Sequence, residues 1–163
     1  MKRLVWSLLL IIVAIGCNKT TVTLTAEEQL AYDIELIEQY LGDHSITDVI
    51  RLENGMRYTM IVTGTGPTPT KDNCFIVNYT GKFLSEEVFD SGTGYGGPLK
   101  APIPGWQIML KLMPVGSKVT VWIPSALAYG PTGRSGIPRN AVLMFDIELT
   151  GIKSYNASGN YCY

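Results

Sequence analysis

Four short segments of the chain combine aromatic side chains with a few polar groups. They are residues 77–81 (VNYTG), 88–92 (VFDSG), 103–106 (IPGW) and 123–149, which reads IPSALAYGPTGRSGIPRNAVLMFDIEL. Together their large apolar side chains could line a water-poor cup in which the polar groups orient a ligand. Considered alone, each aromatic residue could instead be an ordinary core residue, because most buried aromatic side chains pack in the core without binding a ligand. The complete set in this order favours a pocket.

Three other kinds of site are excluded. The chain has one histidine, His44, in a polar loop where we expect it to be solvated, which excludes a Ser/His/Asp triad and a histidine-rich metal site. Residues 92–97 (GTGYGG) match the dinucleotide-binding glycine pattern, but Pro98 and an irregular stretch follow where that fingerprint requires a long helix. We therefore interpret 92–97 as a flexible loop near the site.

In this order the four segments resemble the FKBP family of peptidyl-prolyl isomerases, over roughly residues 55–152. The resemblance implies catalysis of rotation about X-Pro bonds, whose barrier is about 18–20 kcal/mol because of amide resonance. Twisting the C–N bond removes the resonance and lowers the amide dipole, so a dry pocket that grips the prolyl ring favours the twisted form. This chemistry needs no nucleophile, metal or cofactor.

The resemblance implies a catalytic set of Asp90, Trp106 and Tyr129. Trp106 would form the floor under the prolyl ring, and the Tyr129 hydroxyl would donate to the substrate backbone. Asp90 would lie at the pocket edge. Ile103 would contribute its side chain and a backbone N–H donor for a substrate carbonyl.

The resemblance also implies the remaining substrate-binding residues. Tyr79, Phe89 and Phe145 would form the walls of the pocket, and Ile137 would close its loop side. Leu99 stands where a phenylalanine commonly lines the pocket, and is assigned to the same wall.

The chain departs from the family pattern around this pocket. The segment 98–103 is shorter than usual, Pro102 stands where a valine is usual, Arg134-Ser135 replaces a small or histidine-containing loop tip, and residues 137–139 read Ile-Pro-Arg instead of Ile-Pro-Pro. These departures leave binding of the family's macrolide inhibitors open, while the prolyl pocket is expected to be retained.

The elements that position these residues follow from apolar periodicity. Thr25 to Glu28 form a capping box, and a helix with one apolar seam follows and ends at Gly42. The seam consists of Leu30, Ile34, Ile37 and Leu41. We expect it to pack on the domain's own surface, with a second copy of the chain as the alternative.

From residue 56 the apolar period changes to two, which predicts strands over 56–63, 74–83, 118–123 and 141–152. Pro104 opens a predicted short helix through Met113, with Trp106 and Leu110 on its inner face. Several antiparallel strands with one short helix across them make an α+β half-barrel, to which the N-terminal helix is an addition.

The N-terminal residues resemble a secretory leader. Lys2-Arg3 precede an apolar run over 4–15 that is too short to span a bilayer comfortably. Residues 14–17 (AIGC) look like a bacterial lipobox, so we expect lipidation at Cys17; an uncleaved anchor and a plain signal peptide are the alternatives. The expected location is the bacterial cell envelope, at the outer membrane and facing the periplasm.

Lipidation of Cys17 would leave Cys74 and Cys162. An extracytoplasmic location permits a disulfide, and the resemblance places the last strand antiparallel beside the strand that carries Cys74. A residue just past that last strand could therefore reach Cys74. Two unrelated thiols are the alternative.

The length of 163 residues and the hydrophobic content of 46% allow one domain with a core. We divide the chain into a signal peptide (1–16), a lipidated tether (17–24), a helix and linker (25–52), an FKBP-like domain (53–153) and a tail (154–163) that is loose unless Cys162 ties it down. Loss of Lys2 and Arg3 lowers the number of basic residues from 13 to 11 against 14 acidic ones, which gives no electrostatic case for nucleic acid.

The sequence therefore predicts an isomerase that assists the folding of exported proteins, with proline-containing unfolded or exported polypeptides as partners and the membrane as a further partner through the lipid. A non-catalytic peptide-binding or chaperone lipoprotein that uses the same pocket is the alternative.

Overall fold

The computed structural model of the chain describes residues 24–156, 158 and 161–163. Its helices and strands are α1 (Ala26–Asp43), β1 (Ile50–Arg51), β2 (Arg57–Val62), β3 (Asn73–Phe83), β4 (Val88–Pro98), α2 (Pro104–Leu110), β5 (Lys118–Ile123), β6 (Leu143–Asn156) and β7 (Tyr161–Cys162). Two short 3-10 turns, η1 (Ser125–Leu127) and η2 (Gly130–Thr132), lie in the connection between β5 and β6. The strands pair antiparallel in the order β1-β2-β5-β6-β3-β4, and β7 pairs with β6.

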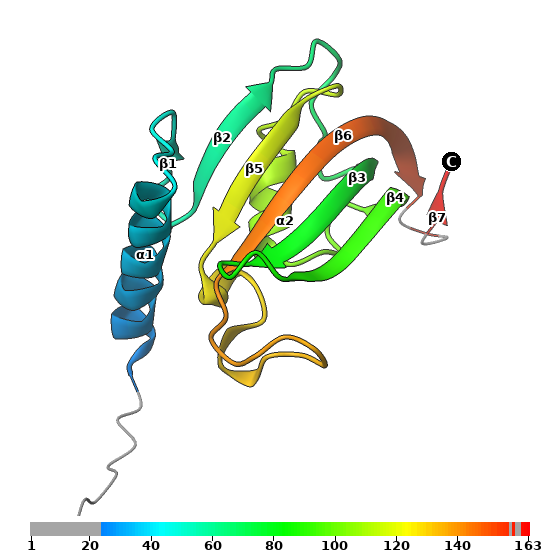
Figure 1. The fold of residues 1–163 in the computed structure, drawn as a ribbon. Coiled ribbons are helices and arrows are strands. Elements are labelled where there is room, and N and C mark those ends of the chain that lie inside the picture. Colours follow the sequence, from blue (N-terminus) through cyan, green and yellow to red (C-terminus); the bar gives the residue numbers. More distant parts are fainter. Residues whose placement is uncertain (1–23, 157, 159–160) are drawn as a thin grey trace, which may run out of the picture.

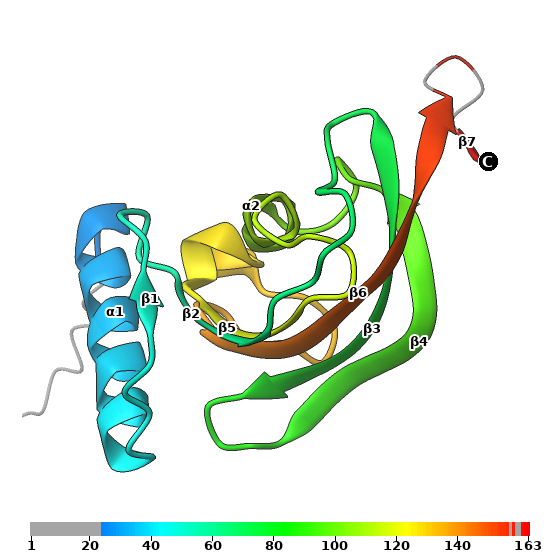
Figure 2. The same cartoon turned by 90° about the horizontal axis from the view of Figure 1, so that it is seen from above.

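The sheet curves around α2, which lies on its concave side (Figures 1 and 2). Alternate residues of β5 and β6, such as Val121 and Phe145, face this side and are buried against Trp106, Met109 and other residues of α2. The period of two in the sequence thus marks the concave face of the sheet. The prediction of an antiparallel half-barrel around one short helix, with an extra N-terminal helix, is confirmed.

The helix α1 packs on the opposite face of the sheet. The residues between the concave positions, Trp122 on β5 and Met144 on β6, form a second buried cluster with Ile37, Tyr40 and Leu41 of α1. The apolar seam of the helix therefore packs on the domain's own surface, as predicted. The end of β5 and β6 that carries Trp122 and Met144 is therefore buried on both faces, whereas Thr120, Asp146 and Glu148 on the same face are only partly buried. This second cluster adds to the core that the concave face provides.

Both ends of α1 are defined by local hydrogen bonds. At the start, the Thr25 hydroxyl accepts from the Glu28 amide at 3.2 Å and the Glu28 carboxylate accepts from the Thr25 amide at 2.8 Å, so the predicted capping box is confirmed. At the end, the prediction that Gly42 ends the helix is wrong. The helix continues one residue further, to Asp43, and Ser45 then turns the chain with a left-handed φ of 53°. The Ile46 amide donates to the Leu41 carbonyl and the Ser45 amide to the Gly42 carbonyl. His44 is exposed, and its ring stacks on that of Tyr40 with centroids 4.0 Å apart.

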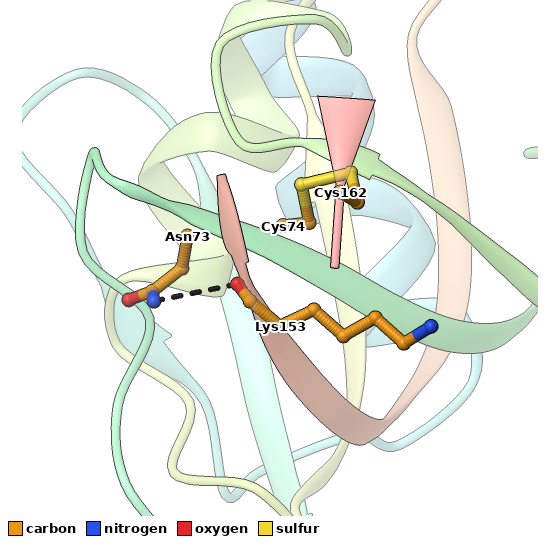
Figure 3. The surroundings of a disulfide bond; sticks show 4 residues. All are labelled: Asn73, Cys74, Lys153 and Cys162. Atoms are coloured by element: carbon orange, nitrogen blue, oxygen red, sulfur yellow. Dashed lines mark hydrogen bonds between the residues drawn. A yellow bond between two sulfur atoms is a disulfide. The ribbon is translucent and has the colours of Figure 1, made fainter. Parts of the chain in front are cut away.

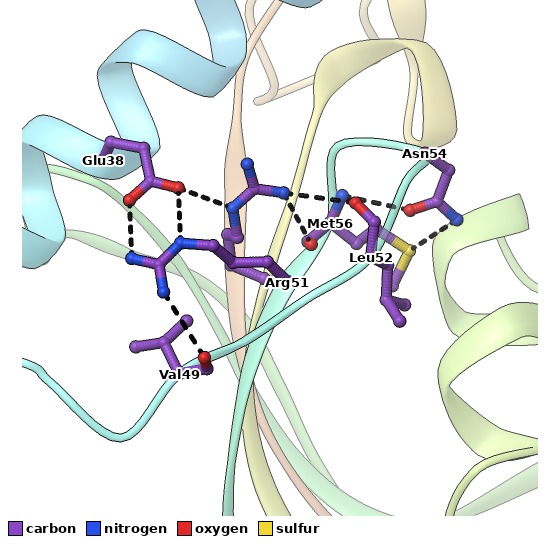
Figure 4. A network of polar contacts seen from close by, with 7 residues as sticks. Glu38, Val49, Arg51, Leu52, Asn54 and Met56 are labelled. Carbon is purple, nitrogen blue, oxygen red and sulfur yellow. Dashed lines mark hydrogen bonds and ion pairs between the residues drawn. The ribbon is translucent and has the colours of Figure 1, made fainter.

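A carboxylate on α1 ties the helix to the first two strands (Figure 4). Glu38 accepts from Arg51 of β1 at 2.9 and 3.0 Å and from Arg57 of β2 at 2.7 Å. Hydrogen bonds from Arg51 and then Arg57 lower the pKa of Glu38 to about 2. The Arg57 guanidinium also donates to the carbonyl groups of Leu52 and Met56 and is mostly buried, so this pair is shielded from water on one side.

The glycine-rich segment 92–97 is part of strand β4, and its interpretation as a flexible loop is wrong. Gly96 and Gly97 pair with Ile76 and Phe75 of β3, and the pairing shifts register between Val77 and Tyr79. Glycine has a low intrinsic preference for the strand conformation, so the hydrogen bonds to β3 hold residues 92–97 in an extended conformation.

The C-terminal residues return to the sheet beside β3. Cys74 of β3 and Cys162 of β7 form a disulfide with sulfur atoms 2.03 Å apart (Figure 3). The Ser154 amide donates to the Tyr163 carbonyl and the Tyr163 amide to the Ser154 carbonyl, both at 3.1 Å. The tail is thus held by a disulfide and by strand pairing. Cys17 and the predicted leader lie outside the described residues.

Within the described part of the chain, no helix has both the length and the apolar character needed to cross a membrane.

Candidate active site

A cavity of about 330 Å³ opens on the concave side of the sheet, between β3, β4, α2 and the connection from β5 to β6. Its lining comes from Tyr79, Phe89, Asp90, Tyr95, Ala101, Pro102, Ile103, Trp106, Tyr129, Arg134 and Phe145. The structure therefore brings together seven of the residues singled out in the four sequence segments. They come from five separate elements or connections: β3, β4, the start of α2, the connection between β5 and β6, and β6 itself.

The floor of the cavity is the indole of Trp106, which is 4% exposed. The ring of Tyr79 meets it edge-on with centroids 5.1 Å apart, and the ring of Phe145 does the same at 5.2 Å. Phe89 extends the wall through an edge-on contact with Phe145 at 5.6 Å. Edge-to-face packing fixes the orientation of each ring, so the cup is preformed and rigid.

Gly81 allows these walls to approach the sheet. It pairs with Phe145 across β6 and with Asp90 across β4. A Cβ at this position would lie 2.7 Å from Phe89 Cζ and 2.8 Å from Phe145 Cε1, closer than atoms can approach. The two phenyl rings therefore occupy the space that any other residue would fill.

One side of the rim carries a hydrogen-bonded phenol and carboxylate. The Tyr79 hydroxyl donates to Asp90 Oδ2 at 2.9 Å. Burial, together with this bond to a carboxylate, raises the pKa of Tyr79 to about 12. Tyr79 therefore stays protonated at neutral pH and holds the exposed carboxylate of Asp90 in one orientation beside the cavity.

The other side of the rim carries Tyr129 and Arg134. Tyr129 precedes η2, and its hydroxyl accepts from Arg134 Nη1 at 3.1 Å while the guanidinium lies 5.6 Å from the centre of its ring. The hydrogen bond raises the pKa of Arg134. Because the bond from Arg134 uses a lone pair of the Tyr129 oxygen, the hydroxyl hydrogen is left to donate elsewhere.

The wall at residues 100–103 is held by the first turn of α2. Gln107 Nε2 donates to the carbonyl groups of Pro102 at 2.8 Å and Lys100 at 3.2 Å, and the Ile103 carbonyl accepts from the amides of Trp106 and Gln107. Pro104 begins the helix at a position where its missing amide costs nothing, as the sequence predicted. The short segment before α2 is thus ordered by side-chain bonds to its carbonyl groups.

Two of the predicted substrate-binding residues do not line this cavity. Ile137 lines a neighbouring hollow of about 220 Å³ that shares Phe89, Asp90, Tyr129 and Arg134 with the cup. Leu99 is 2% exposed, belongs to the core and reaches only a small surface depression beside Lys71 and Lys111.

Sequence reasoning missed Tyr95 and gave Arg134 no place in the site. Tyr95 is 49% exposed, and its ring meets that of Tyr79 edge-on at 5.5 Å and that of Trp106 at 6.3 Å. It lies in the glycine-rich segment interpreted as a loop. Its pairing with Val77 puts its ring over the cup, and this becomes visible only when β4 is aligned with β3.

A curved antiparallel sheet that holds a rigid aromatic cup against a short helix defines a small binding domain with an apolar pocket. The cup has the chemistry of a site for a compact apolar ring with a polar backbone attached. Among the described residues, no group of three or more histidine, cysteine, aspartate or glutamate side chains could hold a metal ion.

Comparison with known proteins agrees with this class. The family model described as FKBP-type peptidyl-prolyl cis-trans isomerase matches residues 66–150. The chain therefore belongs to the FKBP-type peptidyl-prolyl cis-trans isomerase family, and the resemblance inferred from the four segments is confirmed.

Individual relatives give the same result. The chain is 40% identical over 128 residues to the FKBP-type peptidyl-prolyl cis-trans isomerase FkpA of Aeromonas hydrophila, covering 76% of this chain and 48% of that protein. It is 40% identical over 110 residues to the outer membrane protein MIP of Legionella longbeachae, covering 64% of this chain and 47% of that protein. The chain thus spans about half the length of these curated relatives. A crystal structure of a peptidyl-prolyl cis-trans isomerase from Pseudomonas syringae matches with a TM-score of 0.67 at 30% identity, covering 80% of this chain and 98% of that one.

Proposed function

We propose that this protein is a peptidyl-prolyl cis-trans isomerase that binds the prolyl ring of a polypeptide in the aromatic cup and promotes rotation about the preceding bond. The observation that carries the proposal is the open cup above Trp106, with Asp90 and Tyr129 on its rim. Family membership and the names of its relatives support the same activity.

The floor and walls would favour the twisted amide over the planar one. A planar amide has a large dipole that water solvates well, and rotation by 90° removes the resonance that creates it. Trp106, Tyr79 and Phe145 exclude water from the amide without offering strong donors to its planar form. The planar ground state therefore loses more solvation than the twisted state, which lowers the barrier.

Polar groups on the rim would hold the substrate backbone while the bond rotates. The Tyr129 hydroxyl, with Arg134 on its lone pair, is a donor for a substrate carbonyl beyond the prolyl residue. Ile103 lines the cup at the start of α2, and its backbone amide is the second proposed donor. The carboxylate of Asp90, held in place by Tyr79, would interact electrostatically with the carbonyl group and nitrogen of the amide that rotates. Ile137 remains a proposed substrate-binding residue for longer peptides that extend from the cup into the neighbouring hollow, whereas the buried Leu99 is not proposed to contact substrate.

The test is the cis-to-trans rate of an Ala-Leu-Pro-Phe type peptide with residues 18–163, a form without the leader and Cys17, measured with and without a macrolide inhibitor. We expect clear acceleration over buffer by the wild type. Trp106→Ala should lower kcat/KM most, by roughly 100-fold since the floor is lost, and Tyr129→Phe by about 10-fold since one donor is lost. A wild type no faster than buffer that still suppresses aggregation of an unfolded protein would instead support the non-catalytic chaperone alternative.

We further propose that the protein works in the bacterial cell envelope on exported polypeptides that contain proline, held at the membrane by lipid on Cys17. The disulfide between Cys74 and Cys162 supports an oxidising compartment, and the name of the Legionella relative refers to the outer membrane. Labelling with radioactive palmitate in a bacterial host should mark the full chain but not Cys17→Ser. Equal labelling of both would contradict the anchor.

A further inference from the structure

A buried carboxylate on α1 contacts the connection that carries Tyr129. Asp33 is fully buried, and its Oδ2 accepts from the Ser125 amide at 2.7 Å and from the Ser125 hydroxyl at 2.6 Å. Its Oδ1 accepts from Gln29 Nε2 at 2.7 Å. Asp33 and Ser125 are 92 positions apart, so this contact joins the N-terminal helix to the connection between β5 and β6.

The cost of burying Asp33 indicates that the contact is strong. A carboxyl group removed from water loses its hydration, and this loss destabilises the folded state unless charged partners or hydrogen bonds replace the water. Among the ion pairs of residues 24–156, none involves Asp33. The carboxyl group instead accepts three short hydrogen bonds, two of them from Ser125. The helix is thus bound to one particular residue of the connection.

Ser125 is the first residue of the turn that leads to Tyr129. It is 1% exposed and begins η1 directly after Pro124, and its carbonyl accepts from the Ala128 amide at 2.9 Å. Tyr129 follows at the next position. The place of the Tyr129 ring and hydroxyl on the rim therefore depends on where Ser125 is held.

Apolar side chains also pack α1 against the turn that contains Ser125. A Cβ at Gly55, in the turn before β2, would lie 2.9 Å from Leu30, 3.1 Å from Pro124 and 3.2 Å from Ile34. Two residues of α1 and the residue before Ser125 thus converge on one glycine. The helix α1 and the turn at Pro124 and Ser125 therefore pack against each other, and the hydrogen bonds of the Asp33 carboxylate fix how the two are aligned.

We propose that Asp33 is a positioning residue for Tyr129. Through Ser125, the N-terminal helix sets the conformation of the rim loop, so α1 is part of the scaffold of the prolyl site. The activity readout rests on the proposed isomerase function, while the conformation of the loop can be measured without it.

The test compares Asp33→Ala with two conservative variants and a matched control. Asp33→Asn keeps an oxygen that can accept both Ser125 bonds, and rotation of the Gln29 amide can satisfy the new NH₂ group. Ser125→Ala removes the hydroxyl but keeps the amide donor. The control, Ile37→Ala, removes a fully buried side chain of the same helix that packs toward Trp122 and Met144 and lies outside the Asp33 hydrogen bonds.

Two quantities are measured at a temperature where every variant is folded. The first is kcat/KM for the prolyl peptide, and the second is hydrogen exchange of the Leu127 and Ala128 amides, which bond to Pro124 and Ser125. Asp33→Ala should lower kcat/KM about 10-fold and speed exchange of these two amides, while the amides of β3 and β6 keep their rates. Ser125→Ala should give a smaller loss, Asp33→Asn should recover most of the activity, and Ile37→Ala should keep kcat/KM near wild type despite its lower stability.

Each result decides the inference. An Asp33→Ala variant with unchanged kcat/KM and unchanged exchange at Leu127 and Ala128 would overturn it, as would a loss in Ile37→Ala equal to that in Asp33→Ala. If Asp33→Ala does not fold, Ser125→Ala carries the same comparison. A wild type without isomerase activity would refute the proposed function but not this inference, which the exchange rates then decide alone.

Discussion

Replacing Gly81 by alanine should damage the cup without touching any proposed catalytic group. The added methyl would lie 2.7 Å from Phe89 Cζ and 2.8 Å from Phe145 Cε1, whereas ordinary contacts begin near 3.4 Å. The two rings must therefore move by roughly 0.7 Å, or the strands must separate. Overpacking of this kind costs about 1–3 kcal/mol of unfolding free energy. A displacement of this size at the walls should lower kcat/KM by about 10-fold.

Gly97→Ala is the matched control. Gly97 lies in the neighbouring strand β4, has no atom within 4 Å of an added Cβ, and is not among the glycines with positive φ. Both substitutions remove the same backbone freedom from the unfolded chain, so their difference reports on the folded site.

Urea unfolding and the peptide isomerisation assay provide the two measurements. Gly81→Ala should lose stability and kcat/KM relative to Gly97→Ala, and Trp106 fluorescence should respond to the displaced ring of Phe145. If Gly81→Ala kept wild-type stability and kcat/KM, the rings would not be held against the sheet as described, and the rigid cup would be refuted.

The remaining predictions concern the two ties between distant parts of the chain. Cys162→Ser removes a disulfide that closes a loop with a sequence separation of 88, so the unfolding free energy should fall by up to about 4.6 kcal/mol from loop entropy, measured by urea unfolding. Glu38→Gln removes a carboxylate whose pKa is lowered from 4.5 to about 2, so the wild type should be more stable above pH 5 and lose that advantage as the pH falls toward 2. Because the Glu38 side chain is 36% exposed, we expect a difference of only about 1 kcal/mol at pH 7.

Clear outcomes would contradict these two predictions. Cys74→Ser should match Cys162→Ser, and an unfolding free energy equal to that of the wild type in either variant would show that the bond contributes nothing. For Glu38, a stability difference that is the same at pH 7 and pH 2.5 would show that the ion pair with Arg51 and Arg57 is not its source.

The sequence by itself determined the main features of the cup. Tyr79, Phe89, Trp106 and Phe145 were identified because the short segments that carry them resemble the FKBP family. Apolar alternation and a helix opened by proline then placed Tyr79, Trp106 and Phe145 on regular elements. The same local patterns predicted β5 with its correct bounds and the capping box at Thr25. These features depend on residues only a few positions apart, so the order of residues in the chain is enough to predict them.

The tertiary structure decided the features that depend on residues far apart in the chain. The segment 92–97 is glycine-rich and has weak strand propensity, and becomes a strand only because β3 offers it a ladder; that pairing brings Tyr95 to the cup. In the sequence, Asp33 is a polar residue beside an apolar seam. In the structure it is a buried hydrogen-bond acceptor for Ser125, because α1 packs where η1 begins. A sequence pattern reports the local periodicity of the chain, whereas the environment of Asp33 or Tyr95 is created by partners that only folding brings into contact.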